Sequence, residues 1–285
     1  MKLSIITINY NNASGLKKTL DSVAIQTCVD FEHIIVDGAS SDGSVDIIRE
    51  YEQSLASNLS PLTYHLKWIS EKDTGIYNAM NKGIYMANGE YLLFLNSGDY
   101  LVDESVIENV IFHLDGIDII QGNTIEEVSG KIYRNRGYGK SEIDLFDVMR
   151  GHFLHQASFC RKELFEIYGM YDESYRIAGD TKFFMNCLGC KDATFRYVDL
   201  DIANYDVSGI SAQHSTLQKS EADQIYSELF SKCTLDFFYA NSKKVSLYDK
   251  LRKQKLIWYT VMALVHIFDI FSKQTPTSPK KEQIK

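Results

Sequence analysis

The chain has 285 residues, of which 45% are hydrophobic and 24% are charged. This composition is typical of a globular protein, and the length allows one large domain or a domain with an appendage. The net charge of −8 disfavours a nucleic-acid partner, because a phosphate backbone requires a basic surface. The chain contains only three prolines, which argues against long disordered linkers.

Strands and helices are expected to alternate through the first hundred residues. Apolar runs predict buried strands at 3–8, 31–36, 64–69 and 91–95. Apolar residues at helical spacing predict helices after the capping residues Ser14 and Asp42, and from Ile76 to Ala87. Repeated strand–helix units imply a parallel sheet with right-handed crossovers, whose strands are buried on both faces.

The pattern beyond residue 100 is less regular. We expect helices at 102–114, 161–170, 179–188 and 215–240, strands at 117–123 and 193–205, and a hairpin within 124–145.

The segment 243–273 has a basic beginning and an apolar run from Leu256 to Phe271. Three interpretations stay open for it: a packing helix, an interfacial membrane helix, and an oligomer contact. Residues 274–285 are expected to form a disordered terminus.

Cysteine usage and the N-terminus bear on the compartment. Cys187 and Cys190 form a C-x-x-C, but no second pair completes a zinc site. We therefore expect both to be reduced core cysteines in a reducing compartment. The first twelve residues, MKLSIITINYNN, lack the longer hydrophobic region and cleavage site of a signal peptide, which predicts a cytoplasmic protein.

A polar cluster follows each of the first four predicted strands. The clusters are NYNN at 9–12, DGASSDG at 37–43, SEKDTG at 70–75 and NSGD at 96–99. The carboxyl ends of parallel strands share one edge, where open α/β sheets bind ligands. Asp37, Asp73 and Asp99 would then converge, and a divalent cation or the donor groups of a ligand would relieve their repulsion. Oxygen ligands favour Mg²⁺ or Mn²⁺.

Two nucleotide-binding motifs are missing from the sequence. No G-x-x-x-x-G-K-[ST] occurs, which excludes a P-loop protein, and no G-x-G-x-x-G follows the first strand, which disfavours a nicotinamide site.

The order SIITINYNN, HIIVDGASSDGS and SEKDTGIYNAMNKGIYMANGEYLLFLNSGD resembles the family 2 glycosyltransferases of the GT-A fold. Among them it is similar to bacterial enzymes that build O-antigen, capsule or exopolysaccharide. The resemblance covers residues 1–215 and implies an α/β fold with a Rossmann-like, mostly parallel sheet flanked by helices. It divides this domain into a nucleotide-binding half, 1–100, and an acceptor half, 101–215. A helical C-terminal extension at 216–273 would follow.

The resemblance also implies roles for single residues. Asn9, Tyr10, Asp37, Asp73 and Asp99 would line the nucleotide pocket, with Asp37 at the base or ribose. NSGD at 96–99 takes the place of the family's metal-binding D-x-D, so Asp99 is expected to meet the metal and the diphosphate. Its outer positions are Asn96 and Gly98 instead of acids, which implies a weaker hold on the metal.

Three later segments complete the implied site. Asp180, in RIAGDTKFF, is the expected general base. His155 and Gln156, in GHFLHQASF, would line the sugar and acceptor side, and SGIS at 208–211 resembles the family's closing loop.

These assignments predict an inverting glycosyltransferase that moves a sugar from a nucleotide-diphosphate sugar, with a UDP-sugar favoured, to a saccharide acceptor. We expect a lipid-linked acceptor at the inner face of the plasma membrane, with peripheral membrane contact through 243–273.

Two alternatives are weighed against this prediction. A nucleotidyltransferase needs a Gly-rich basic loop after the first strand, which NYNNASG does not provide. A catalytically degenerate domain that binds nucleotide sugar or a partner stays open, because the acids are missing at Asn96 and Gly98.

Overall fold

The computed structural model describes residues 1–57, 64–207 and 215–253. The chain separates into two compact units, Met1–Leu229 and Phe230–Lys285. The first unit contains the sheet and all predicted site residues, so its architecture determines where those residues lie.

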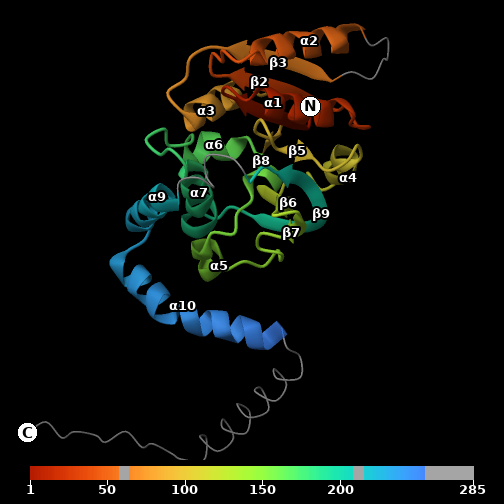
Figure 1. Ribbon diagram of the computed structural model, residues 1–285. Coiled ribbons are helices and arrows are strands. Elements are labelled where there is room, and N and C mark those ends of the chain that lie inside the picture. The colour runs from red at the N-terminus through yellow and green to blue at the C-terminus, as the bar shows by residue number, and fades with distance from the viewer. Residues whose placement is uncertain (58–63, 208–214, 254–285) are drawn as a thin grey trace, which may run out of the picture. The chain divides into compact units, whose positions relative to one another are not determined.

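The first half of the sheet is parallel, as predicted. Its strands are β1 (Leu3–Asn9), β2 (Phe31–Asp37), β3 (His65–Ser70) and β4 (Tyr91–Phe94), in the spatial order β3-β2-β1-β4. They are connected by α1 (Ala13–Ala24), α2 (Ser44–Ser57) and α3 (Ile76–Met86) (Figure 1). The residues of β1, β2 and β4 are all buried, because helices cover both faces of a parallel sheet.

Alternate residues of β1 pack against different helices. Leu3 and Ile5 share a buried cluster with Leu16 of α1. Ile6 points to the opposite face, where a Cβ built on Gly83 of α3 would lie 2.4 Å from its Cγ2 atom. The missing side chain at Gly83 therefore lets α3 pack closely on the sheet.

The second half of the sheet is mixed. Beyond β4 the strand order is β8-β6-β9-β5, and only β6 and β9 pair in parallel. The strands are β5 (Tyr100–Leu101), β6 (Ile119–Val128), β7 (Lys131–Asn135), β8 (Ser158–Arg161) and β9 (Phe195–Tyr205). The helices are α4 (Val106–Ile111), α5 (Leu145–Arg150), α6 (Glu163–Tyr168), α7 (Gly179–Met185) and α9 (Ser215–Leu229). The predicted α/β fold is thus confirmed (Figure 1).

Three local predictions differ from the structure. The predicted helix 102–114 is shortened to α4, because Tyr100–Leu101 pairs with β9 as a strand. The predicted helix 215–240 is interrupted, and α10 (Lys232–Lys253) begins after the end of α9. Strand β8 was not predicted; it has only four residues and is stabilised by pairing with β4 and β6. The hairpin expected within 124–145 is formed by β6 and β7.

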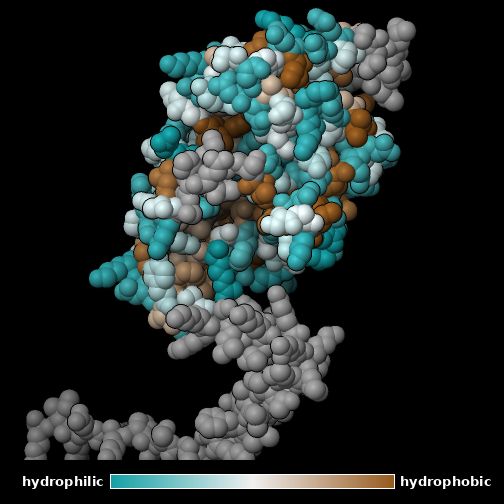
Figure 2. Space-filling model, in the orientation of Figure 1, coloured by the Kyte–Doolittle hydropathy of each residue, from teal (hydrophilic) through white to brown (hydrophobic). Residues whose placement is uncertain are grey.

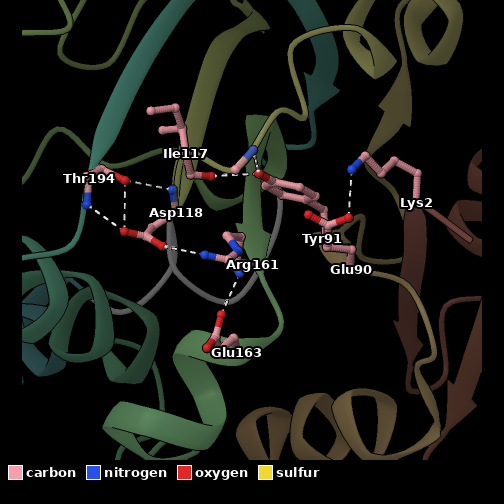
Figure 3. Close-up of polar contacts among 9 residues, drawn as sticks. Lys2, Glu90, Tyr91, Ile117, Asp118, Arg161, Glu163 and Thr194 are labelled. Atoms are coloured by element: carbon pink, nitrogen blue, oxygen red, sulfur yellow. Dashed lines mark hydrogen bonds and ion pairs between the residues drawn. The ribbon is translucent and has the colours of Figure 1, made fainter.

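A polar network joins the strands at the edge opposite the carboxyl end of β4 (Figure 3). The Tyr91 hydroxyl donates to the Ile117 carbonyl at 2.9 Å. Asp118 accepts from the backbone and hydroxyl of Thr194, both at 2.8 Å, and pairs with Arg161 at 3.4 Å. The starts of β4, β6 and β9 and the end of β8 are therefore held together across the two halves.

The structure shows one of the two C-x-x-C cysteines in the predicted buried position. Cys187 is buried, as expected, whereas Cys190 is exposed because the chain leaves the helical turn Asn186–Cys190 there.

Among the helices that the structure describes, none combines the length and the hydropathy needed to span a membrane. Residues 254–273 of the predicted extension, which include nearly all of the apolar run, and all of 274–285 lie outside the described residues. On the face in Figure 2, hydrophobic residues of the first unit form small separate patches among hydrophilic ones.

One buried titratable group predicts a pH-dependent stability. His33 in β2 has no exposed surface, and burial lowers its pKa from 6.5 to about 3. Between these values the unfolded chain binds a proton that the folded chain excludes, so stability falls as the pH decreases from about 6.5 toward 3. The slope is at most about 1.4 kcal/mol per pH unit.

We expect His33→Gln to flatten this dependence in urea unfolding followed at several pH values. His65→Gln, at an exposed position of β3, should leave the slope unchanged; equal slopes in all three proteins would contradict this account.

Candidate active site

Three neighbouring strands end in one hydrogen-bonded row. The strand register places Asn9 beside Asp37 and Asp37 beside Ser70. The Asn9 amide donates to Asp37 Oδ1 at 2.8 Å, and the Ser70 hydroxyl donates to Asp37 Oδ2 at 2.6 Å. The backbone N–H of Ser40 also donates to Oδ2, at 2.9 Å. The parallel register therefore builds this end of the site.

Asp37 is the centre of that row and has no exposed surface. Burial opposes its ionisation, but hydrogen bonds from Ser40, Ser70 and Asn9 outweigh this effect and hold its pKa below the usual range. Its carboxylate orders Asn9 and the turn after β2. The predicted contact of Asp37 with a base or ribose stays a prediction.

Tyr10 and Asp73 lie over Gly38, next to this row. A Cβ at Gly38 would be 2.5 Å from Asp73 Oδ2 and 3.0 Å from Tyr10 Cδ2. Asp73 is fixed by the Gly75 N–H, which donates to its Oδ1 at 3.1 Å. Tyr10 is 66% exposed, so its ring offers a surface on which a planar group can stack. A side chain at position 38 would therefore displace the Asp73 carboxylate from its present place.

Asp99 occupies the corner after β4 and is only 4% exposed. The Asp206 backbone N–H donates to its Oδ1 at 2.8 Å. Burial raises the pKa of Asp99 to about 7; the Asp206 N–H, the nearby His155 and a hydrogen bond from Gln156 oppose this rise, while the Asp206 charge adds to it. A cation at this carboxylate would favour its ionised form.

Gly98, in the same corner, lies close to the side chain of Asp206. Gly98 has a φ of +110°, a conformation that L side chains rarely adopt, and a Cβ there would lie 2.7 Å from Asp206 Oδ2. The Gly98 N–H donates to the hydroxyl of Thr19 in α1 at 3.0 Å, and that hydroxyl donates to the Asp99 carbonyl at 2.6 Å. Helix α1 therefore holds the corner in shape.

Asn96 adds an oxygen to the same corner. Its Oδ1 atom is buried and has no hydrogen-bond partner within the described part of the chain. A carboxylate and an amide oxygen are the donors that Mg²⁺ and Mn²⁺ prefer. Asn96 and Asp99 therefore fit a divalent cation.

Asp37, Asp73 and Asp99 do not form the single cluster expected from the sequence. Within residues 1–57, 64–207 and 215–253, no three His, Cys, Asp or Glu side chains gather closely enough to hold a metal ion. The physical reason is the strand order: β1 lies between β2 and β4, so their ends are about 10 Å apart. The expected convergence of the three carboxylates is therefore not found among the described residues, whereas the assignment of the metal to Asp99 stays a prediction.

Asp180 lies in the first turn of α7, and both oxygens of its carboxylate have a side-chain partner. His155 Nδ1 is 2.8 Å from Asp180 Oδ2, and the Tyr77 hydroxyl donates to Oδ1 at 3.0 Å. Burial opposes ionisation of Asp180, but His155, the Thr181 N–H and Tyr77 hold its pKa below the usual range. Asp180 is thus a partly buried carboxylate kept in its ionised, basic form.

His155 connects Asp180 with the corner after β4. Its Nε2 lies 3.4 Å from Asn96 Nδ2. Burial opposes protonation, but the hydrogen bond and charge of Asp180, together with the charge of Asp99, raise the pKa of His155. The structure therefore brings Asn96, Asp99, His155, Gln156 and Asp180 together. The roles predicted for these residues stay predictions.

Comparisons with known proteins identify the family of this chain. Residues 4–170, more than half of the chain, match the model of glycosyl transferase family 2. The chain belongs to glycosyltransferase family 2. A "PGL/p-HBAD biosynthesis glycosyltransferase" of Mycobacterium bovis is 32% identical over 211 residues, covering 72% of this chain and 77% of that protein. The chain is therefore a glycosyltransferase, as the resemblance implied.

Solved structures with the same fold are more distant in sequence. Staphylococcus aureus TarS 1–349 in complex with UDP-GlcNAc has a TM-score of 0.61 and 19% identity, over 80% of this chain and 71% of that one. A mannosyltransferase from Pyrobaculum calidifontis, in complex with GDP-Man and Mn²⁺, has a TM-score of 0.55 and 15% identity, over 93% and 86%. These similarities show the glycosyltransferase fold.

Sequence reasoning missed several residues of this family 2 site. The hydroxyl of Ser40 accepts from the Asn9 amide, and those of Ser70 and Thr19 donate to Asp37 and to the Asp99 carbonyl. A sequence pattern does not single out these contacts. Tyr77 had a visible signal, because it ends the D-x-G-x-Y segment that begins at Asp73. Its contact with Asp180 spans 103 residues of sequence, and only the fold shows it.

Gly98 offers a test of the corner. We expect Gly98→Ala to abolish cation-dependent UDP binding, because the new methyl group would push Asp206 away from Asp99. Gly116→Ala is the matched control: its φ is +104°, and no atom lies within 4 Å of the added Cβ. Both variants should lose about 1–2 kcal/mol of stability from backbone strain. Calorimetric titration and thermal unfolding separate the two effects; UDP binding by Gly98→Ala equal to that of the control would contradict the prediction.

Proposed function

We propose that this family 2 glycosyltransferase is an inverting enzyme that transfers a sugar from a UDP-sugar to a saccharide acceptor. The observation that carries the proposal is the pair of carboxylates on the two sides of His155. Asp99 is buried with a raised pKa, and Asp180 is held ionised by His155 and Tyr77. Asp99 would bind a cation, and Asp180 would remove a proton from the acceptor.

The proposed chemistry follows from these two environments. Asp99 and Asn96 would hold Mn²⁺ or Mg²⁺, which would neutralise the charge that develops on the leaving diphosphate. The diphosphate would supply further ligands, since the corner offers few of its own. Asp180 would accept the proton of the acceptor hydroxyl as it attacks the anomeric carbon. A single displacement of this kind inverts the configuration at that carbon.

The nucleotide pocket would be formed by Asn9, Tyr10, Asp37 and Asp73, with the base against the exposed ring of Tyr10. UDP is favoured because TarS structures contain UDP-GlcNAc and UDP. GDP is the competing nucleotide, because the mannosyltransferase structure contains GDP-Man. His155 and Gln156 would line the sugar and acceptor side.

A lipid-linked saccharide acceptor is the finer part of the proposal, with a role in bacterial surface polysaccharide synthesis such as O-antigen or capsule. The basic-apolar segment 243–273 would bring the enzyme to the inner face of the plasma membrane. A chain ending at residue 242 should then no longer sediment with anionic lipid vesicles, and unchanged sedimentation would remove this part of the proposal.

Asp99 is tested first by binding. We expect titration calorimetry to show UDP binding in Mn²⁺ that weakens at least about tenfold without the ion and in Asp99→Ala, because a lost charged ligand costs more than about 1.4 kcal/mol. Asp103→Ala is the control: its carboxylate accepts from nearby Ser105, and the backbone carbonyl that accepts from Gln26 is kept in the variant. GDP titrated in parallel tests the base. Equal binding of UDP by Asp99→Ala and wild type would reject the cation site.

Asp180 is tested by turnover. UDP release from a panel of UDP-sugars should fall about 10²–10⁴-fold in Asp180→Asn, the usual contribution of general base catalysis. UDP affinity should fall much less than turnover, because the contacts of Asp180 are with His155, Tyr77 and the Thr181 N–H rather than with Asn9, Tyr10, Asp37 or Asp73. Asp223→Asn, at an exposed position of α9, serves as control. No turnover by the wild-type chain, or turnover that does not need Asp180, would favour the degenerate domain.

A further inference from the structure

Glu221 of α9 is a buried acid outside the proposed machinery. It is 7% exposed, and both of its carboxylate oxygens accept hydrogen bonds from consecutive backbone N–H groups. Oε1 accepts from Arg176 at 2.8 Å, and Oε2 accepts from Ile177 at 3.0 Å and Ala178 at 2.8 Å. Burying a carboxylate is costly unless donors satisfy it, so this side chain and this turn are matched to each other.

The turn at 176–178 leads directly into the helix that carries Asp180. Helix α7 has Ala178 at its N-cap, and no side-chain hydrogen bond caps it locally. The first N–H groups of a helix lack partners within it, and a Ser, Thr, Asn or Asp usually accepts from them. Here Glu221 of another helix supplies an acceptor just before the first turn.

Ile177 is held on both sides of its backbone. Its N–H donates to Glu221, and its carbonyl accepts from the Tyr77 hydroxyl at 2.5 Å. The same hydroxyl contacts Asp180 Oδ1. Gly179 leaves little room between them, because a Cβ there would lie 2.8 Å from the Tyr77 ring. A shift of the turn would therefore move Asp180.

We infer that Glu221 is a positioning residue: by binding the N–H groups of 176–178, it sets where the Asp180 carboxylate lies against His155. The consequence for catalysis rests on the proposed role of Asp180 as general base. The positional effect itself does not need that role.

Attachment of α9 to the rest of the first unit does not depend on Glu221 alone. Glu228 of the same helix pairs with Lys182 of α7 at 2.7 Å, and the Tyr226 hydroxyl donates to the Met149 carbonyl. The Glu228 pair is partly exposed, and exposed ion pairs contribute little to stability. Glu228→Gln is therefore a matched control: it removes a charge from the same helix and a contact to the same α7.

The first experiment observes His155 without any substrate. Side-chain ¹H–¹⁵N spectra are recorded at one pH for the wild type, Glu221→Gln and Glu228→Gln, and the His155 signal is assigned by its loss in His155→Gln. In Glu221→Gln an amide NH₂ group would face backbone donors, so we expect the turn to shift and the His155 Nδ1–H signal to move or broaden. An unchanged signal, or the same change in Glu228→Gln, would overturn the inference. If Glu221→Gln does not fold, Glu221→Asp, shorter by one methylene, is judged by the same signal.

The second experiment separates catalysis from folding. With the UDP-sugar that the wild type turns over, kcat of Glu221→Gln should fall about 10- to 100-fold, the loss expected when a reacting group is displaced by about 1 Å. KM for the donor and the affinity for UDP should stay within about twofold. A parallel loss of kcat and UDP affinity would indicate a general folding role and would also overturn the inference. Failure of the proposed function is distinct: Asp180→Asn would then keep its turnover, whatever the His155 signal shows.

Discussion

The parallel register of β1 is the constraint on which the rest of this molecule depends. β1 lies between β2 and β4, so Asn9 stands beside Asp37 on one side, and the chain beyond β4 turns at Asn96 on the other. Parallel strands end at a common edge, and the polar clusters that follow them meet there. A slip of one residue would reverse the direction of every side chain in β1 and bury the wrong face. The apolar packing of β1 against α1 and α3 thus also determines the geometry of the polar site.

Charge at this site is controlled by burial and by partners acting in opposite directions. Asp99 and Asp180 are both carboxylates in protected positions, yet the pKa of Asp99 is raised and that of Asp180 is lowered. The difference lies in their neighbours, because Asp180 has His155, Tyr77 and the Thr181 N–H. Two like residues in unlike environments can take two different roles, and His155 connects them across the sheet edge.

The parts of the site differ in how far the sequence reveals them. Asp99 and Asp180 were predicted from short segments, and His155 lies between them in the structure; their roles stay predictions. The carboxylate of Asp37 accepts from Asn9, Ser40 and Ser70, contacts that the sequence did not reveal, and its predicted contact with the nucleotide stays a prediction. The proposed cluster of three acids failed because strand order is set by pairing across the sheet, which a pattern of apolar runs does not contain.

The sequence by itself determined the alternation of strands and helices in residues 1–100, because period and turn residues are local properties. It also placed polar clusters at four strand ends, and the family segments pointed to the residues of the site. The tertiary structure alone decided the mixed second half of the sheet and the contact of Tyr77 with Asp180. It also decided the hydrogen bonds between Glu221 and the turn at 176–178. These contacts join residues 43 to 103 positions apart. They form because packed helices and paired strands bring distant segments together, and a local sequence pattern does not predict contacts between such segments.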